Sequence, residues 1–147
     1  RGGNFIFCPE ELGSMWDNVM EFRKIGIQHF VIGIATPENE LDISAIQALC
    51  AAFPEAAFTL HKVIDYVVDP LSAIPAINQI PNLTSILTSG GAATALEGAA
   101  QIMAIQTALH PSKHLIAAGK ITQENLALVQ SKIEVPAYHG RRILGEL

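Results

Sequence analysis

Short apolar segments rich in β-branched and aromatic residues recur along the chain at a spacing of roughly 28 residues, about the length of one strand plus one helix. Segments with so few polar residues are typical of strands that are buried on both faces of a parallel sheet. The expected strands are residues 28–35, 57–61, 85–88, 114–118 and 135–139. Their alternation with helical patterns predicts a parallel sheet with helices packed outside it.

The segments between the strands carry helical signals. Asp42 or Ser44 can cap one helix, and Asp69 followed by Pro70 is a typical start of another. Pro75 should kink that second helix or keep it short, because proline removes a backbone donor. The expected helices are residues 9–25, 42–52, 71–78, 93–109 and 122–131.

Two α/β architectures fit this order of elements: a doubly wound open sheet and a (β/α)8 barrel. A barrel usually needs about 250 residues, and this chain has 147. Five strands cannot close a standard barrel, so we expect residues 1–147 to form a single partial domain. The chain begins at Arg1 instead of Met, which suggests a fragment or a processed chain.

The charge and hydropathy of the chain argue against nucleic acids and membranes as partners. The net charge of -5 argues against a nucleic-acid-binding protein, which usually has a basic face. No apolar run is long enough to span a bilayer, and no signal peptide is visible. Cys8 and Cys50 lie in no metal-ligand spacing, so we expect both to be reduced and buried. We therefore expect a cytoplasmic protein with no membrane partner.

Polar and glycine residues gather where the expected strands end. In parallel α/β folds, ligands bind at the carboxyl ends of the strands. Four of the five expected strands are followed there by residues that can bind or react: His61, Lys62 and Asp65; Thr88, Ser89, Gly90 and Gly91; Gly119 and Lys120; His139, Gly140 and Arg141.

Each of these groups has a chemical and a purely structural interpretation. In a closed barrel, His61 and His139 would face the same mouth, where they could bind a metal with Asp65 or act as acid and base. Alternatively, each histidine caps the end of its strand. Gly90 and Gly91 could admit an anion to a helix N-terminus, or could only form a tight turn. Lys120 could form a Schiff base if desolvated, or could point into solvent.

Five motifs resemble the CutC family, which is named for copper homeostasis: RGGNF, TLHKVIDYVVDP, ILTSGG, AAGKITQENL and YHGRRI. The resemblance runs across nearly the whole chain, in order. It implies a (β/α)8 TIM barrel of which this chain covers about the third helix to the eighth strand. It also implies a homo-oligomer. Copper as a bound metal is implied by this resemblance alone, because no thiolate cluster that would suit Cu(I) is visible.

The resemblance also implies a set of residues at the barrel mouth. They are Arg1, Gly2, Gly3, His61, Asp65, Ser89, Gly90, Gly119 and His139. The chain departs from the family pattern at three places: Lys62 stands where arginine is usual, Asn4 where aspartate is usual, and the turn AAGKI holds fewer glycines. Neither Cys8 nor Cys50 matches the cysteines proposed as copper ligands in animal members.

Two functions from different classes follow. The first is binding and handling of copper in the cytosol. The second is an enzyme that acts on a small anionic or phosphorylated metabolite, with His61, Asp65 and His139 as catalytic residues. For this second function the expected ligand-binding residues are Arg1, Gly2, Gly3, Lys62, Ser89, Gly90, Gly91, Gly119 and Lys120. Either way, the expected partner is a small molecule or a metal. Whether the protein is an enzyme stays open.

Overall fold

Five parallel strands form one sheet in the order of the sequence. In the computed structural model, which describes residues 4–145, each strand pairs with the next one along the chain. The strands are β1 (His29–Ile32), β2 (Ala57–Leu60), β3 (Leu83–Thr88), β4 (His114–Ala118) and β5 (Ala137–His139). All five overlap the segments expected from the sequence, and the predicted parallel α/β sheet is confirmed.

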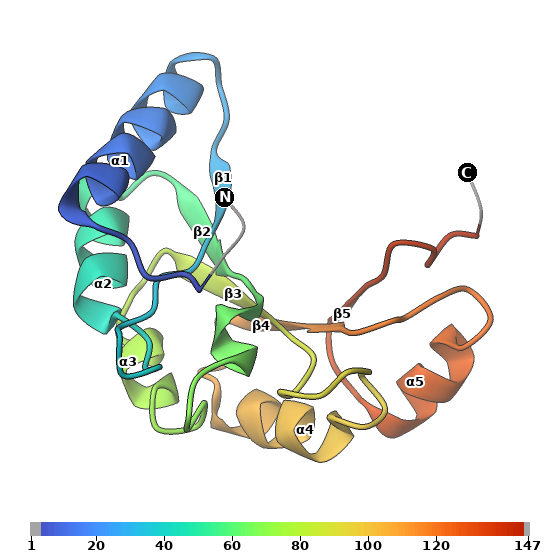
Figure 1. The fold of residues 1–147 in the computed structure, drawn as a ribbon. Helices are drawn as coiled ribbons and strands as arrows, with labels where there is room; N and C mark the ends of the chain where they lie inside the picture. Colours follow the sequence, from blue (N-terminus) through green and yellow to red (C-terminus); the bar gives the residue numbers. More distant parts are fainter. Residues whose placement is uncertain (1–3, 146–147) are drawn as a thin grey trace.

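Helices follow or precede the strands and cover the outer face of the curved sheet (Figure 1). They are α1 (Pro9–Lys24), α2 (Ile43–Ala52), α3 (Ile74–Asn78), α4 (Ala99–Ala108) and α5 (Leu126–Lys132), together with a short 3-10 helix, η1 (Lys62–Asp65), directly after β2. The sheet curves as an arc, and its concave side is not covered by helices of residues 4–145 (Figure 1).

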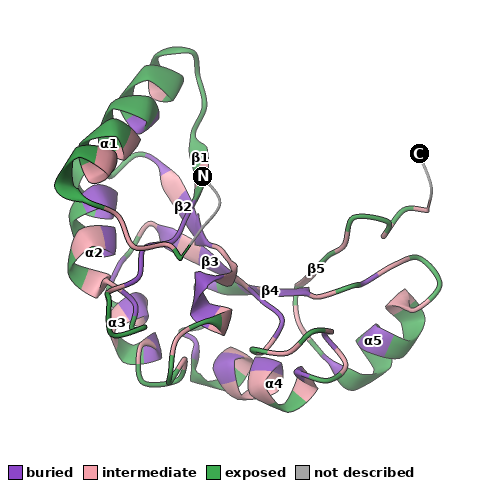
Figure 2. Ribbon diagram, in the orientation of Figure 1, coloured by how far each residue is buried: buried purple, intermediate pink, exposed green. Residues whose placement is uncertain are grey.

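The core lies between the central strands and the helices outside them (Figure 2). Phe58 and Leu60 of β2 and Ile86 of β3 are fully buried, and they belong to one cluster with Ile46 of α2 and Ile102 of α4. Burying such side chains contributes about 1.5–3 kcal/mol each relative to exposure. The middle of the sheet is thus the most deeply buried part of the platform beneath the strand ends.

Three helices, α3, α4 and α5, begin later than the sequence suggests. Helix α4 starts at Ala99, whereas we expected it to start at residue 93, directly after the glycine pair. Two hydrogen bonds stabilise the intervening loop: Thr94 N–H donates to Glu97 Oε2 (3.0 Å), and Glu97 N–H donates to Thr94 Oγ1 (3.2 Å). Helix α5 likewise starts at Leu126, not at residue 122. Side chains that satisfy backbone donors outside a helix delay its first turn.

Helix α3 is short, as expected from Pro75, and spans five residues. Asp69 was expected to cap it. Instead, Asp69 Oδ1 accepts hydrogen bonds from the N–H groups of Leu71 (3.0 Å) and Ser72 (3.2 Å), in a turn that precedes the helix.

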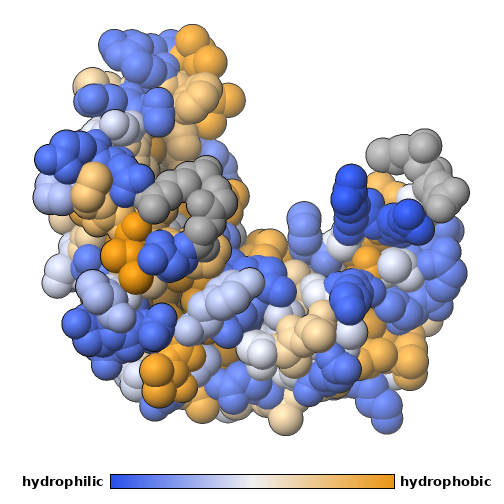
Figure 3. Space-filling model, viewed as in Figure 1, coloured by the Kyte–Doolittle hydropathy of each residue, from blue (hydrophilic) through white to orange (hydrophobic). Residues whose placement is uncertain are grey.

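Strand β1 forms one edge of the sheet within residues 4–145, and it leaves apolar surface uncovered. Val31 is 64% exposed, and Ile25 and Ile27, between α1 and β1, are 74% and 44% exposed. Figure 3 shows hydrophobic residues beside hydrophilic ones at the tip of the left-hand arm, while mostly hydrophilic residues gather at the tip of the opposite arm, near the end of β5.

Candidate functional site

The carboxylate of Asp65 joins the end of β2 to the end of β3. Its side chain is only 6% exposed. Oδ1 accepts hydrogen bonds from Thr88 Oγ1 and from the N–H groups of Ser89 (3.1 Å) and Gly91 (3.0 Å). Oδ2 accepts from Ser89 N–H (2.9 Å) and lies 2.8 Å from Ser89 Oγ. The loop after β3 is therefore folded around this carboxylate.

These bonds determine the charge state of Asp65. Burial alone would raise the pKa of the carboxyl, but the hydrogen bonds from Thr88, Ser89 and Gly91 outweigh it and hold the pKa below its usual value. Asp65 is consequently an anion at neutral pH. The glycine loop, which the sequence suggested as a cradle for an external anion, already holds the chain's own carboxylate.

Lys62 extends from this cluster toward solvent. Its Nζ donates to Ser89 Oγ (2.8 Å) and lies 3.4 Å from Asp65 Oδ2. The ammonium is thus held by one hydroxyl and one carboxylate, while 38% of the side chain stays exposed. That exposed part lines a cavity at the carboxyl ends of β4 and β5.

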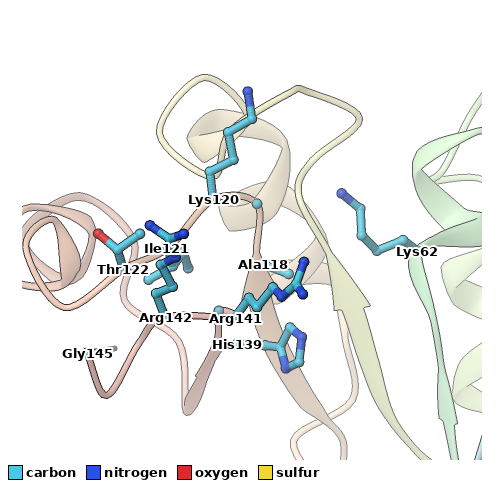
Figure 4. A pocket seen from close by; sticks show the side chains of 11 residues that line it. Lys62, Ala118, Lys120, Ile121, Thr122, His139, Arg141, Arg142 and Gly145 are labelled. Carbon is cyan, nitrogen blue, oxygen red and sulfur yellow. The ribbon is translucent and has the colours of Figure 1, made fainter. Parts of the chain in front are cut away.

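This cavity has a volume of about 980 Å³, and its polar lining is predominantly cationic. Its charged side chains come from three places along the chain: Lys62, Lys120, Arg141 and Arg142. His139 lies beside them at the end of β5. Figure 4 shows the ends of Lys62 and Arg141 turned toward each other, with the His139 ring next to Arg141. We call this cavity the basic pocket.

His61 lies in a different cavity. Its ring contacts Phe5, with centroids 4.8 Å apart, and lies against Gly33, where a Cβ atom would overlap the imidazole. The surrounding lining is largely apolar and includes Phe22 and Val31, and the volume is about 530 Å³. Burial lowers the pKa of His61, against a smaller opposing effect of its backbone hydrogen bond. Nδ1 accepts a bond from Val63 N–H (3.0 Å), so the neutral ring caps η1.

The structure divides the residues predicted from the sequence into groups. Lys62, Gly119, Lys120 and His139 line the basic pocket. Asp65, Ser89, Gly90 and Gly91 form the cluster beneath Lys62, where Gly90 N–H donates to Thr88 Oγ1 (2.9 Å). His61 and His139 do not share a pocket. Arg1, Gly2 and Gly3 lie outside the described residues.

Arg141 and Arg142 follow β5 in the motif YHGRRI, and both line the basic pocket. The sequence placed Arg141 at a carboxyl end but did not include it among the expected ligand-binding residues, and it did not single out Arg142. The position of both residues at a carboxyl end is the signal that favours them.

The donors for a soft metal are sparse. Cys50 is buried, as expected, and burial raises the pKa of its thiol to about 12, against an opposing effect of Lys113. Cys8 is exposed, which corrects the expectation that both cysteines are buried. Among residues 4–145, no group of three or more histidine, cysteine or acidic side chains is arranged to hold a metal ion.

Comparisons with known proteins agree on one family. The model of the CutC family matches residues 1–143. The chain is 30% identical to a family protein CutC of Bacteroides thetaiotaomicron over 139 residues, and 27% identical to one of Pasteurella multocida. Each alignment covers 95% of this chain but only 55% and 57%, respectively, of the relative. The chain thus spans little more than half the length of these relatives.

A solved structure supports the fold. The crystal structure of CutC from Streptococcus agalactiae, whose name proposes a role in copper homeostasis, aligns with a TM-score of 0.88 at 26% identity. The alignment covers 97% of this chain and 70% of that one. The predicted barrel-type α/β fold is thereby confirmed. The assignment of this chain to the third helix through the eighth strand stays a prediction.

Replacing Asp65 with asparagine should destabilise the protein by about 2–4 kcal/mol. The amide retains one acceptor oxygen but presents an NH2 group to donors that then lack a partner, in a site with little solvent. Urea unfolding measures the loss. Asp69→Asn is the matched control: its Oδ1 acceptor survives in an exposed turn, so we expect a change below about 0.5 kcal/mol. Equal losses would contradict a special role for Asp65.

His61 should make stability depend on pH below about 6.5, its ordinary pKa. The folded-state pKa is lowered, so above pH 6.5 neither state binds the proton. As the pH falls, the unfolded state is protonated first and folding weakens, until the pH passes the folded-state value. Protonation at Nδ1 would also remove the acceptor for Val63 N–H.

Urea unfolding at pH 8 and pH 5 measures this effect. Wild type should lose roughly 0.5–1 kcal/mol more than His61→Gln, a modest figure because the ring is only partly buried. Identical losses in both proteins would show that His61 does not contribute.

Proposed function

The chain belongs to the CutC family, and from this premise we propose that it binds a small anionic ligand, such as an organic phosphate, in the basic pocket. The carrying observation is the gathering of Lys62, Lys120, Arg141 and Arg142 around one cavity of a protein whose net charge is -5. Concentrating cations in one concave site raises the local concentration of anions. The volume of the pocket lies in the range typical of sites for small metabolites.

Lys62 and Arg141 are the proposed principal contacts. Lys62 follows β2 and Arg141 follows β5, and their side chains face each other (Figure 4). Within residues 4–145, the guanidinium of Arg141 has no carboxylate partner, so an incoming anion need not displace one. A guanidinium presents parallel donors that suit phosphate or carboxylate oxygens, and an ammonium adds a point charge.

His139 is the proposed acid or base of this site. It lies in the same pocket as Lys62 and Arg141, so a ligand held by these cations would be near its ring. The sequence-based acid/base pair of His61 and Asp65 has less support. Both oxygens of Asp65 accept hydrogen bonds from the protein, and His61 faces the apolar cavity. That the bound anion also reacts, as in the enzyme function expected from the sequence, remains a prediction.

Copper binding is the second candidate, favoured by the name of the Streptococcus agalactiae protein. Cu(I) prefers thiolate and thioether ligands. In the part of the chain that the structure describes, the exposed Cys8 is the accessible thiol, and no cluster of donors accompanies it. The described residues therefore give direct copper binding less support than anion binding.

Location and assembly are further proposals. We propose a cytoplasmic location on the basis of the sequence, and a homo-oligomeric state on the basis of the family resemblance. No helix among residues 4–145 is long and apolar enough to cross a membrane.

Inorganic phosphate in millimolar amounts should raise the thermal unfolding midpoint of the protein, because a ligand that binds only the folded state stabilises it. Arg141→Gln should weaken phosphate binding about tenfold, the usual scale for loss of a charge-assisted contact. Isothermal titration measures the affinity, with chloride at equal ionic strength as the reference.

Lys132→Gln is the matched control for this experiment, since it removes a charge from the end of α5, outside the pocket. Its phosphate affinity should equal that of wild type. The proposal fails if neither phosphate nor a carboxylate stabilises the wild-type protein, or if both variants behave alike.

Cu(I) titration against a competing chelator tests the second candidate. We expect no stoichiometric copper binding, and no difference between wild type and Cys8→Ser. One equivalent of tightly bound copper that is lost in Cys8→Ser would instead establish direct copper handling.

A further inference from the structure

Lys120 has a backbone conformation that lysine rarely adopts. Its φ is +51°, in the left-handed region, and the residue directly follows β4. Three non-glycine residues between positions 4 and 145 have positive φ, and one of them is Asn39. Asparagine tolerates the left-handed conformation because its short side chain can hydrogen-bond locally, but a lysine side chain has no such compensation. Glycine would suit the backbone better at position 120.

The surrounding structure imposes this conformation. The carbonyl of Gly119 accepts a hydrogen bond from Ala95 N–H (2.9 Å), which anchors the turn to the loop before α4. On the other side, Asn125 Nδ2 donates to the Lys120 carbonyl (2.9 Å), and Asn125 Oδ1 accepts from Thr122 N–H (2.9 Å). The turn is therefore fixed at both ends, and its shape does not depend on a lysine side chain.

The side chain of Lys120 has no structural partner that would explain its presence. It is exposed, lines the basic pocket, and makes no hydrogen bond or ion pair with any residue from 4 to 145. Figure 4 shows it rising away from Arg141 and His139, toward the outer part of the site. The cations of the basic pocket thus lie in two places: Lys62 and Arg141 face each other, and Lys120 stands apart.

Strained residues persist where the surroundings over-determine them, and they are common at functional sites. We propose that Lys120 is a specificity-determining residue that binds a second anionic group of the ligand. The ligand class is then a small molecule with two separated anionic groups, such as a bisphosphate or a phosphorylated acid. One group binds between Lys62 and Arg141, and the other binds Lys120. This inference rests on the anion-binding function proposed above.

The experiment compares wild type, Lys120→Gly and Lys120→Gln, with Lys132→Gln as the control for loss of a remote charge. Two probes are titrated calorimetrically: inorganic phosphate, and propane-1,3-diyl bisphosphate, which carries two separated phosphates. The thermal midpoint of each protein is measured without ligand. Lys120→Gly removes both the charge and the backbone strain, whereas Lys120→Gln removes only the charge.

We expect wild type and Lys132→Gln to bind the bisphosphate more tightly than phosphate. In both Lys120 variants this preference should fall about five- to tenfold, the scale of one charge-assisted contact. The affinity for phosphate should fall much less, by about twofold at most, because Lys62 and Arg141 are its principal contacts and Lys120 adds only its longer-range charge. Without ligand, Lys120→Gly should melt about 2–4 °C above wild type, and Lys120→Gln should not.

Each remaining outcome overturns a distinct claim. If wild type binds neither probe, the anion-binding function fails and the role of Lys120 fails with it. If wild type binds phosphate but Lys120→Gly keeps the full preference for the bisphosphate, only the role of Lys120 is refuted. An equal weakening of both probes would place Lys120 at the first anionic group and refute the two-group ligand.

Discussion

The carboxylate of Asp65 is the interaction on which the functional edge of this fold depends. Parallel strands pair along their length, but nothing in that pairing fixes the loops beyond their ends. Here one buried anion receives backbone and hydroxyl donors from the loop after β3 and also lies next to the ammonium of Lys62. The same charge therefore shapes a loop and positions a cation. A neutral amide of equal size would do both less well, because it offers one acceptor oxygen instead of two and carries no charge to attract Lys62.

From this cluster the carboxyl edge divides into two regions of different chemistry. Adjacent residues at the end of β2 enter different cavities: His61 packs against Phe5 and Gly33, and Lys62 lines the basic pocket. Successive side chains of an extended chain point in opposite directions, and this alternation continues into the start of η1. A pocket whose charged side chains are all cationic and a cavity lined mainly by aromatic and aliphatic side chains thus begin at adjacent residues, so the apolar surface near β1 lies in a different cavity from the proposed anion site.

The sequence predicted the sheet well because the evidence for each strand is local. Runs such as AFTL at Ala57–Leu60 carry their β signal within a few residues. The start of α4 was predicted wrongly, because the glycine pair after β3 suggested a helix N-terminus. The donors of that loop in fact face Asp65, 24 to 26 residues earlier in the chain. The placement of His61 and His139 in different cavities could not be predicted from the sequence either, since it depends on side-chain directions that strand order alone does not specify. The cationic character of the pocket could have been anticipated from Arg141 and Arg142 after β5.

The contact between His61 and Gly33 has a consequence for how such sequences can vary. A methyl group at position 33 would occupy the volume of the imidazole, so the two positions share a single space across neighbouring strands. A lineage that keeps the histidine can accept a side chain at position 33 only if the imidazole moves, while one that replaces the histidine with a small side chain releases that position from glycine. Substitutions at the two sites should therefore be historically contingent, with the change at position 61 coming first.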